Sequence, residues 1–356
     1  LLREGNWCSA RKEIKLSFKN NGEVLSKMIS LEFAFSNMLS PAILFFILGV
    51  IAVSVKSDLE IPDSIGSAIT LYILISIGLK GGVAVSKTGI LGVVIPALSA
   101  IIMGILIATV VYYIMSKIGF DPANAGSIAG HYGACSSITL TTVLVFLEQM
   151  GASYEEFVPA LYPFMDTAAL LTAIVLGHAG LKKRSVEVEK GEYNIRDILR
   201  TSLTAKSTLL IFGGFLIGLI SGVEGTKSLM PFYDNIFKGI FTIFMLDIGI
   251  LAGSRIFELK SVKPVALVLA IILPLLQAFM AIILATFIGL SPGGATVFAA
   301  LAGGASYITA PAVMRSTFPD ANPSVALGMS LGIIFPFNIL IGIPLYYQIA
   351  IIISKL

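Results

Sequence analysis

The segments GACSSIT at residues 133–139 and GGASYIT at residues 303–309 decide the fold of this chain. Both lie in apolar surroundings, and they match each other at an offset of about 170 residues. Two further pairs occur in the same order at nearly the same offset: IGLKGG (77–82) with IGILAG (248–253), and YPFMD (162–166) with FPFN (335–338). Each match is weak by itself, because Gly and Ala are frequent in this chain. Three matches in one order predict an internal repeat.

The composition predicts a polytopic membrane protein. Of the 356 residues, 56% are hydrophobic and 13% are charged, and the mean hydropathy is +0.93. A soluble domain carries about 25% charged residues, so this chain has too few to cover a water-facing surface of its size. With only Cys8 and Cys135, it is not a disulfide scaffold, and its small net charge of +3 argues against nucleic acid as a partner.

Apolar runs between polar breaks give ten candidate membrane spans, since a bilayer core of about 30 Å needs about 20 apolar residues per helix. We expect the spans to start near Pro41, Ile65, Gly89, Ala123, Val158, Thr208, Ile236, Val265, Ala295 and Val325. The polar gap after the fifth span separates a first five-span repeat (28–181), a loop (182–207) and a second five-span repeat (208–356). Five is an odd number, so the repeats must have opposite orientations, as is typical of secondary transporters. The predicted fold is an all-α polytopic membrane protein with ten transmembrane helices in two inverted five-helix repeats and broken crossing helices.

The distribution of Lys and Arg orients the chain. The central loop is rich in basic residues, which predicts that it is cytoplasmic and that both termini lie outside. Residues 1–27 are polar and lack the apolar core of a signal peptide. Our hypothesis is that translation starts at Met28 and that residues 1–27 are a non-native, upstream-translated extension. A genuine N-terminal tail is the alternative.

Each repeat contains one candidate helix break, at Gly130–Thr142 in the fourth span and at Gly303–Pro311 in the ninth. Pro311 has no backbone donor, and N–H groups freed at a half-helix N-terminus attract anions. Irregular backbone at membrane depth is tolerated only where it is buried or lines a watery cavity. We therefore expect an anionic substrate to bind at Gly133, Ala134, Cys135, Ser136, Ser137, Gly304, Ala305, Ser306 and Tyr307. The alternative is that these small residues only permit close helix packing.

Ionisable groups inside a span are costly, so each is a candidate functional residue. Asp166 lies in the fifth span, and Asn338 lies near the equivalent place in the other repeat. We expect sodium to bind at Asp166, Thr139, Thr309, Asn338 and Asp247. The alternatives are a structural hydrogen bond for Asp166 and a helix cap or a pairing with a nearby base for Asp247.

The sequence gives only weak indications of other anion-binding, metal-binding or catalytic residues. Lys80 either attracts an anion or extends to the outer surface, and His131 either lines the cavity or is a packed histidine. His131 and His178 are too far apart in sequence for the usual metal-site spacing. An intramembrane aspartyl protease needs paired carboxylates, and the repeat does not relate Asp166 to Asp247. We therefore expect no enzyme activity and no cofactor beyond sodium as coupling ion.

Several motifs are similar to those of one family, the sodium-dependent bicarbonate transporters of cyanobacteria and their bacterial relatives. These motifs are LYPFMD (161–166) followed by AL (169–170) and TAIV (172–175), IGL (77–79) with GG (81–82), ANPS (321–324) and IPL (343–345). The resemblance implies a homotrimer in a bacterial inner membrane and sodium-coupled uptake of bicarbonate, with the substrate between the two broken helices. In cyanobacterial members a PII-type regulator binds from the cytoplasm.

The chain departs from the family pattern at four positions. The family carries acidic residues where Tyr307 and Leu251 stand here, an apolar residue at Asp247 and a small polar residue at Lys80. The predicted fold does not depend on these four positions, whereas the identity of the substrate does. Transport of another small anion such as a monocarboxylate, or a non-transporting anion sensor, therefore remains as an alternative.

Overall fold

The computed structural model describes residues 40–89, 91–183, 200, 204, 206–255, 262–307 and 309–355. The predicted N-terminal extension (1–27) and most of the central loop (182–207) lie outside these residues. Throughout the described ranges the chain is helical and contains no β-strand.

The helices follow the predicted order of spans. The first half contains α3 (Pro41–Ser54), α4 (Asp63–Thr88), α5 (Leu91–Lys117), α6 (Pro122–Gly133), α7 (Ser137–Gln149), η1 (Val158–Leu161) and α8 (Tyr162–Lys183). The second half contains α10 (Lys206–Thr226), η2 (Pro231–Asn235), α11 (Phe237–Arg255), α12 (Pro264–Phe287), α13 (Pro292–Ala302), α14 (Thr309–Thr317), α15 (Pro323–Met329), η4 (Ser330–Ile334), α16 (Phe335–Phe337), η5 (Asn338–Gly342) and α17 (Ile343–Ile353). The last five elements run on without a gap from Pro323 to Ile353.

The protein is a multi-pass membrane protein. Among the described residues, eight helical segments are long and apolar enough to cross a membrane. The apolar helices α3, with 14 residues, and α13, with 11, are shorter. Because both fall below the length of about 20 residues that a bilayer core requires, the total of ten spans stays a prediction.

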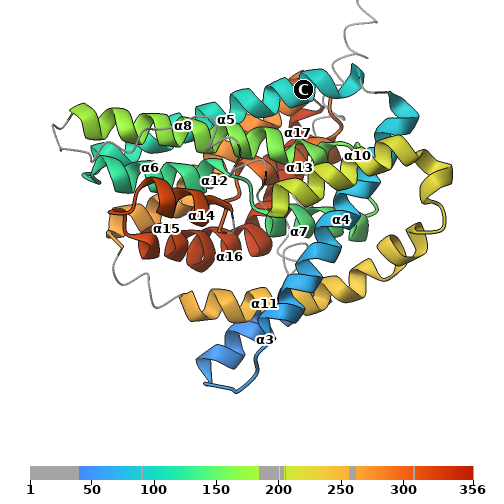
Figure 1. The fold of residues 1–356 in the computed structure, drawn as a ribbon, viewed down its shortest axis with the longest axis horizontal. Helices are drawn as coiled ribbons and strands as arrows, with labels where there is room; N and C mark the ends of the chain where they lie inside the picture. Colours follow the sequence, from blue (N-terminus) through green and yellow to red (C-terminus); the bar gives the residue numbers. More distant parts are fainter. Residues whose placement is uncertain are drawn as a thin grey trace, which may run out of the picture. The chain divides into compact units, whose positions relative to one another are not determined.

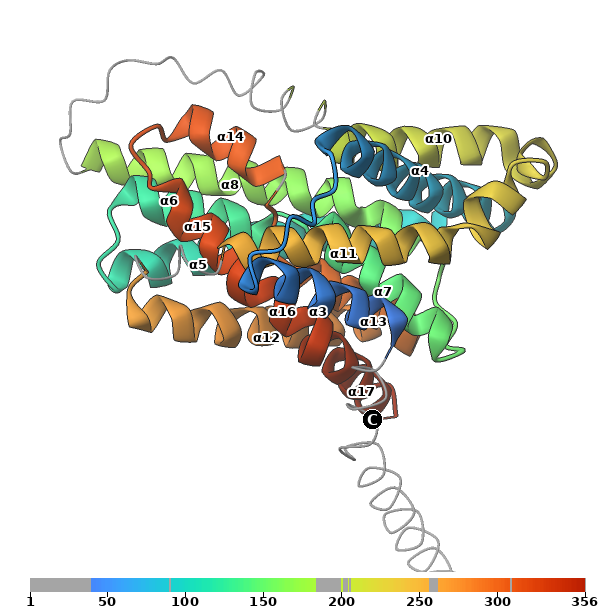
Figure 2. The same ribbon diagram turned by 90° about the horizontal axis from the view of Figure 1, so that it is seen from below.

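Four helices form one group, which we call the four-helix group: α3, α4, α10 and α11 (Figures 1 and 2). Within it α4 packs along α10, and α3 packs along α11. Glycines allow both approaches, because a Cβ on Gly82 would overlap the carbonyl oxygen of Phe215, and one on Gly49 would lie 2.7 Å from the backbone nitrogen of Ile250. These pairings join helices that are distant in sequence.

The remaining helices form a second group, the broken-helix group, which comprises α5 to α8 and α12 to α17. Here α5 and α8 pack on each other and on α6, while α12 and α17 pack on α13. The half-helices α6 and α13 are among the most deeply buried elements. The residues of the predicted binding segments therefore lie inside this group.

Caps fix the starting points of both buried half-helices. Asp121 accepts hydrogen bonds from the backbone N–H groups of Ala123 and Asn124, both at 3.0 Å, at the start of α6. Ser291 caps α13 through the N–H of Gly294 at 3.1 Å. Glu155 in turn accepts from the N–H of Ser291 at 2.7 Å and from its hydroxyl at 3.0 Å. Each half-helix also has proline in its first turn, where the missing donor is harmless.

The close contact between α4 and α10 predicts a sharp difference between two glycines of α10. Replacing Gly218 with alanine should lower the thermal stability of the purified protein in detergent, because the new Cβ overlaps the carbonyl oxygen of Leu79 and lies 3.0 Å from the nitrogen of Val83. Overpacking of this kind costs about 1–3 kcal/mol. The matched control is Gly213→Ala, whose Cβ meets nothing within 4 Å. Equal melting temperatures for the two variants would contradict the observed helix contact.

Candidate functional site

Two helices are interrupted at the predicted positions. The first break comprises residues 134–136, between α6 and α7, and the second begins at Gly303 and ends where α14 starts at Thr309. Residue 308 lies outside the described residues. Both breaks fall within the segments that the sequence marks, Gly130–Thr142 and Gly303–Pro311.

The two breaks touch each other through their backbones. The N–H of Ser306 donates to the carbonyl oxygens of His131 at 2.8 Å and Ala134 at 3.0 Å. An ideal Cβ on Gly304 would lie 3.3 Å from both the Cβ and the nitrogen of Ser136. We call this contact the crossing. It brings together the residues predicted to bind substrate, and all of them are buried: Gly133, Ala134, Cys135, Ser136, Ser137, Gly304, Ala305, Ser306 and Tyr307.

One serine caps each half-helix that leaves the crossing. The Oγ of Ser136 accepts from the N–H of Thr139 at the start of α7, and the Oγ of Ser306 accepts from the N–H of Ala310 at the start of α14, both at 3.2 Å. A hydroxyl that accepts through a lone pair still has its O–H to donate. Helix N-termini also carry partial positive charge. The crossing therefore presents hydroxyl donors and two helix N-termini, which is the chemistry that an anion requires.

Helix α8 holds the first break through two side chains one turn apart. The fully buried Asp166 accepts from the N–H of Cys135 through Oδ1 at 3.0 Å, and the hydroxyl of Tyr162 donates to the carbonyl of Cys135 at 3.1 Å. The Cys135 thiol is buried and forms no disulfide. Asp166 thus has the structural hydrogen bond that was the alternative to cation binding. That bond uses only one of its two carboxylate oxygens.

Among the buried oxygens at the breaks that have no hydrogen-bond partner are Oδ2 of Asp166, the Oγ1 atoms of Thr139 and Thr309, and the hydroxyl of Tyr307. Carboxylate and other oxygen ligands are those that hard cations prefer. Three of the five predicted sodium ligands, Asp166, Thr139 and Thr309, therefore each have one buried oxygen without a partner. This donor set fits sodium.

Asn338 holds the second break. Its Nδ2 donates to the carbonyl of Gly303 at 2.8 Å, and its Oδ1 accepts from the hydroxyl of Tyr346 at 2.7 Å. Asn338 and Asp166 thus occupy comparable positions, each binding one break, as the sequence match between residues 162–166 and 335–338 suggests. The role of Asn338 as a sodium ligand stays a prediction.

Two other predicted residues lie in the four-helix group. Asp247 on α11 lies against α4, where an ideal Cβ on Gly66 would be 2.9 Å from its Oδ2. Lys80 on α4 forms an ion pair with Asp234, and its ammonium lies 5.4 Å from the centre of the Phe237 ring. Lys80 is therefore engaged away from the crossing.

Sequence reasoning missed three polar residues around the breaks. Tyr162 and Tyr346 position the breaks, as described above. Gln277 on α12 is buried and has no partner for either amide atom. It lies between Pro274 and Ala278, both of which border Gly303. Its signal in the sequence is a lone amide in an otherwise apolar helix.

We predict that Asp166→Asn removes sodium binding while preserving the fold, because the asparagine oxygen can still accept from Cys135. Sodium should raise the melting temperature of the wild-type protein above its value in equimolar potassium, since a ligand that binds only the native state stabilises it. In Asp166→Asn this difference should vanish. The control is Asp58→Asn, which removes an exposed carboxylate in the segment between α3 and α4. A normal sodium effect in Asp166→Asn would exclude Asp166 as a ligand.

Comparison with known proteins identifies one matching family. The family model of the Na+-dependent bicarbonate transporter superfamily matches residues 41–351, which include both breaks and both helix groups. No curated protein matches the chain.

Proposed function

Because the chain belongs to the Na+-dependent bicarbonate transporter superfamily, we propose that it is a secondary active transporter that takes up bicarbonate together with sodium by alternating access. The superfamily is one of transporters and not of enzymes. The observation that carries the proposal is the crossing, where two helix N-termini and two serine hydroxyls lie beside the unpartnered buried oxygens of Asp166, Thr139 and Thr309.

The anion would bind to the donors of the crossing. The N-terminal turns of α7 and α14 offer partial positive charge, and Ser136, Ser137 and Ser306 offer O–H donors. Bicarbonate has several oxygens that can accept from such groups. Because the crossing is buried, these interactions are not screened by bulk water.

Sodium would bind to Asp166, Thr139 and Thr309, and this would couple the two solutes. Without a cation, the carboxylate of Asp166 repels an anion at the adjacent Cys135 and Ser136. With sodium bound, the local charge is neutralised and the anion binds more favourably. Such coupling is reciprocal, so the anion must strengthen sodium binding by the same factor. Asn338 and Asp247 are further candidate ligands.

The two helix groups would provide the alternating movement. The second helix of each half packs on the first helix of the other half (α4 on α10, α11 on α3), and this reciprocal exchange supports the proposal of two inverted repeats. A cavity of about 580 Å³ lies between α4, α10 and α7. Among the described residues one ion pair joins the groups, Lys238 with Glu148 at 2.9 Å, and both side chains are more than half exposed. Exposed pairs contribute about 0–1 kcal/mol, so this pair would not lock the groups together.

The orientation and the assembly are also proposals. The basic central loop would face the cytoplasm of a bacterial cell and both termini would lie outside. The chain would form a homotrimer in the inner membrane. A PII-type regulator would bind at the cytoplasmic face, as in the cyanobacterial members.

We predict that labelled bicarbonate enters proteoliposomes only when an inward sodium gradient is imposed. At limiting sodium, Asp166→Asn should lower this uptake by about tenfold or more. A tenfold effect corresponds to about 1.4 kcal/mol, which is a modest free energy for the loss of a charged ligand. Competition by monocarboxylates tests for another small anion as substrate. Binding of bicarbonate without flux, in vesicles of folded protein, would mean that the protein is a sensor.

A further inference from the structure

The cavity of about 580 Å³ between the two helix groups opens among charged side chains, and we call it the vestibule. Helices α4, α10 and α11 border it from the four-helix group, and α7 with residues 152–159 borders it from the broken-helix group. All but one of its charged side chains are exposed, so this part of the vestibule is in contact with water. These side chains are Lys80, which is half-buried, and Lys87, Glu148, Glu156, Glu224, Lys227 and Asp234.

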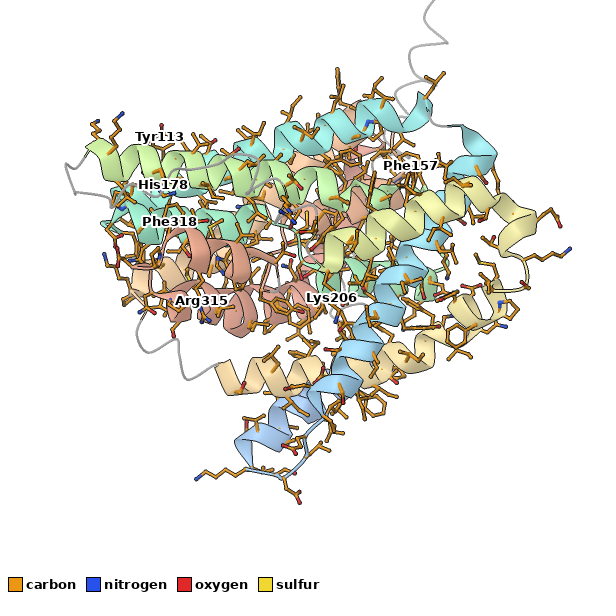
Figure 3. All side chains as sticks on the ribbon, in the orientation of Figure 1. Tyr113, Phe157, His178, Lys206, Arg315 and Phe318 are labelled. Atoms are coloured by element: carbon orange, nitrogen blue, oxygen red, sulfur yellow. The ribbon has the colours of Figure 1, made fainter. Side chains whose placement is uncertain are left out.

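The vestibule lies at the end of α8 that is remote from the central loop. Its lining residue Pro159 precedes α8, whereas the central loop follows the other end of this helix. Figure 3 shows Phe157, from the same segment as Pro159, and His178, from the last turns of α8, at opposite ends of this helix. In the orientation proposed above, the vestibule therefore opens to the outside.

The inner part of the vestibule is apolar and approaches the crossing. It is bordered there by the buried side chains of Ile77 on α4 and of Leu144 and Val145 on α7. Helix α7 begins at the crossing with Ser137, seven residues before Leu144. Seven residues of α-helix span about 10 Å. A solute that reaches Leu144 is therefore about two helical turns from the predicted substrate site.

Met245 of α11 contacts the stretch of α7 that separates the vestibule from the crossing. Its sulfur lies 4.0 Å from Oγ1 of Thr142. In the sequence of α7, Thr142 comes between Ser137 at the crossing and Leu144 at the vestibule. Met245 itself is fully buried, and it lies eight residues beyond Phe237, which borders the vestibule. The four-helix group thus covers α7 at this point with one flexible side chain.

This contact is easily broken. A thioether is only a weak acceptor, and the hydroxyl of Thr142 has a stronger one in the carbonyl of Ile138, at 2.8 Å. Methionine is unbranched and has three rotatable bonds, so its side chain can turn aside without movement of the backbone. Met245 can therefore open a path between α11 and α7 at a small cost in free energy.

The vestibule itself is too large to select a small anion. Cavities of about 300–1,000 Å³ hold drug-sized molecules, whereas bicarbonate has four non-hydrogen atoms. The vestibule also carries charges of both signs, so it does not sort solutes by charge. Selection by size must then occur between the vestibule and the crossing, where Met245 lies.

We propose that the vestibule is the entrance for solutes and that Met245 is a specificity-determining residue, which admits only small solutes to the crossing. The identity of the solute rests on the function proposed above. The larger monocarboxylates would enter the vestibule but would be held back at Met245. The route and its size limit are properties of the protein that can be measured without any transported substrate.

The thiol of Cys135 reports passage to the crossing, because it lies there and forms no disulfide. The purified, full-length protein in detergent is treated with a small anionic thiol reagent, 2-sulfonatoethyl methanethiosulfonate, or with a bulky one, a stilbenedisulfonate maleimide. Mass spectrometry follows the labelling of Cys135, with Cys8 as internal reference. Met245→Ala should accelerate labelling by the bulky reagent about tenfold, equivalent to about 1.4 kcal/mol of barrier, and labelling by the small reagent less. The control Met150→Ala, which removes an exposed methionine at the end of α7, should change neither rate.

A second variant tests the route even if Met245→Ala does not fold. Ala152 is half-buried and borders the vestibule, so Ala152→Trp should fill part of it and slow the labelling of Cys135 by both reagents. The expected effect is about tenfold for the bulky reagent. Ser228→Trp is the matched control, because Ser228 is exposed and follows Lys227 but does not border the vestibule. It should leave both rates unchanged.

The outcomes separate this inference from the proposed function. Labelling that responds to both variants as expected, without any uptake of bicarbonate, would support the entrance and count against the proposed substrate. Sodium-dependent uptake of bicarbonate, with labelling of Cys135 unaltered in both variants, would support the function and overturn the entrance. Equal acceleration of both reagents by Met245→Ala would overturn the selection by size.

Discussion

The structure depends on backbone hydrogen bonds between two interrupted helices. Breaking a helix at membrane depth frees N–H and C=O groups that have no water to bind, and each unsatisfied group would cost several kcal/mol. The N–H of Ser306 resolves part of this by binding the carbonyls of His131 and Ala134 in the other break. Other features hold the same hydrogen bonds in place. They are the caps by Ser136 and Ser306, the contacts from Asp166 and Asn338, and the burial of α6 and α13.

This requirement accounts for the division of the molecule into two groups. The broken-helix group must be tightly packed, because its freed backbone groups are satisfied only by their partners within it. The helices of the four-helix group are not interrupted in this way. They pack through glycines that let α4 approach α10 and α3 approach α11. The broken-helix group and the four-helix group are thus packed separately, and this arrangement suits relative movement of the two groups during transport.

Much of this could be predicted from the sequence, for local reasons. The starts of the helices follow from apolar run lengths, and the breaks follow from Gly, Ser and Pro inside those runs. The repeat identified Asn338 as the counterpart of Asp166. Non-local partners could not be predicted: the pairing of Lys80 with Asp234, and the contact of Glu155 with Ser291, the residue that caps α13, join segments more than a hundred residues apart in sequence. Gln277 was missed because one amide in an apolar helix has no meaning until its neighbours are known.

The contacts of Asp166 and Asn338 have a consequence for the charge at the crossing. Asp166 accepts from an amide of one break, whereas Asn338 donates to a carbonyl of the other. A protein assembled from two copies of the first half would bring two carboxylates to the crossing, and one assembled from two copies of the second half would bring none. The first would require two compensating cations and the second would have no acidic group to attract any. A single carboxylate at the crossing therefore requires different residues at positions 166 and 338, an acid that accepts on one side and an amide that donates on the other.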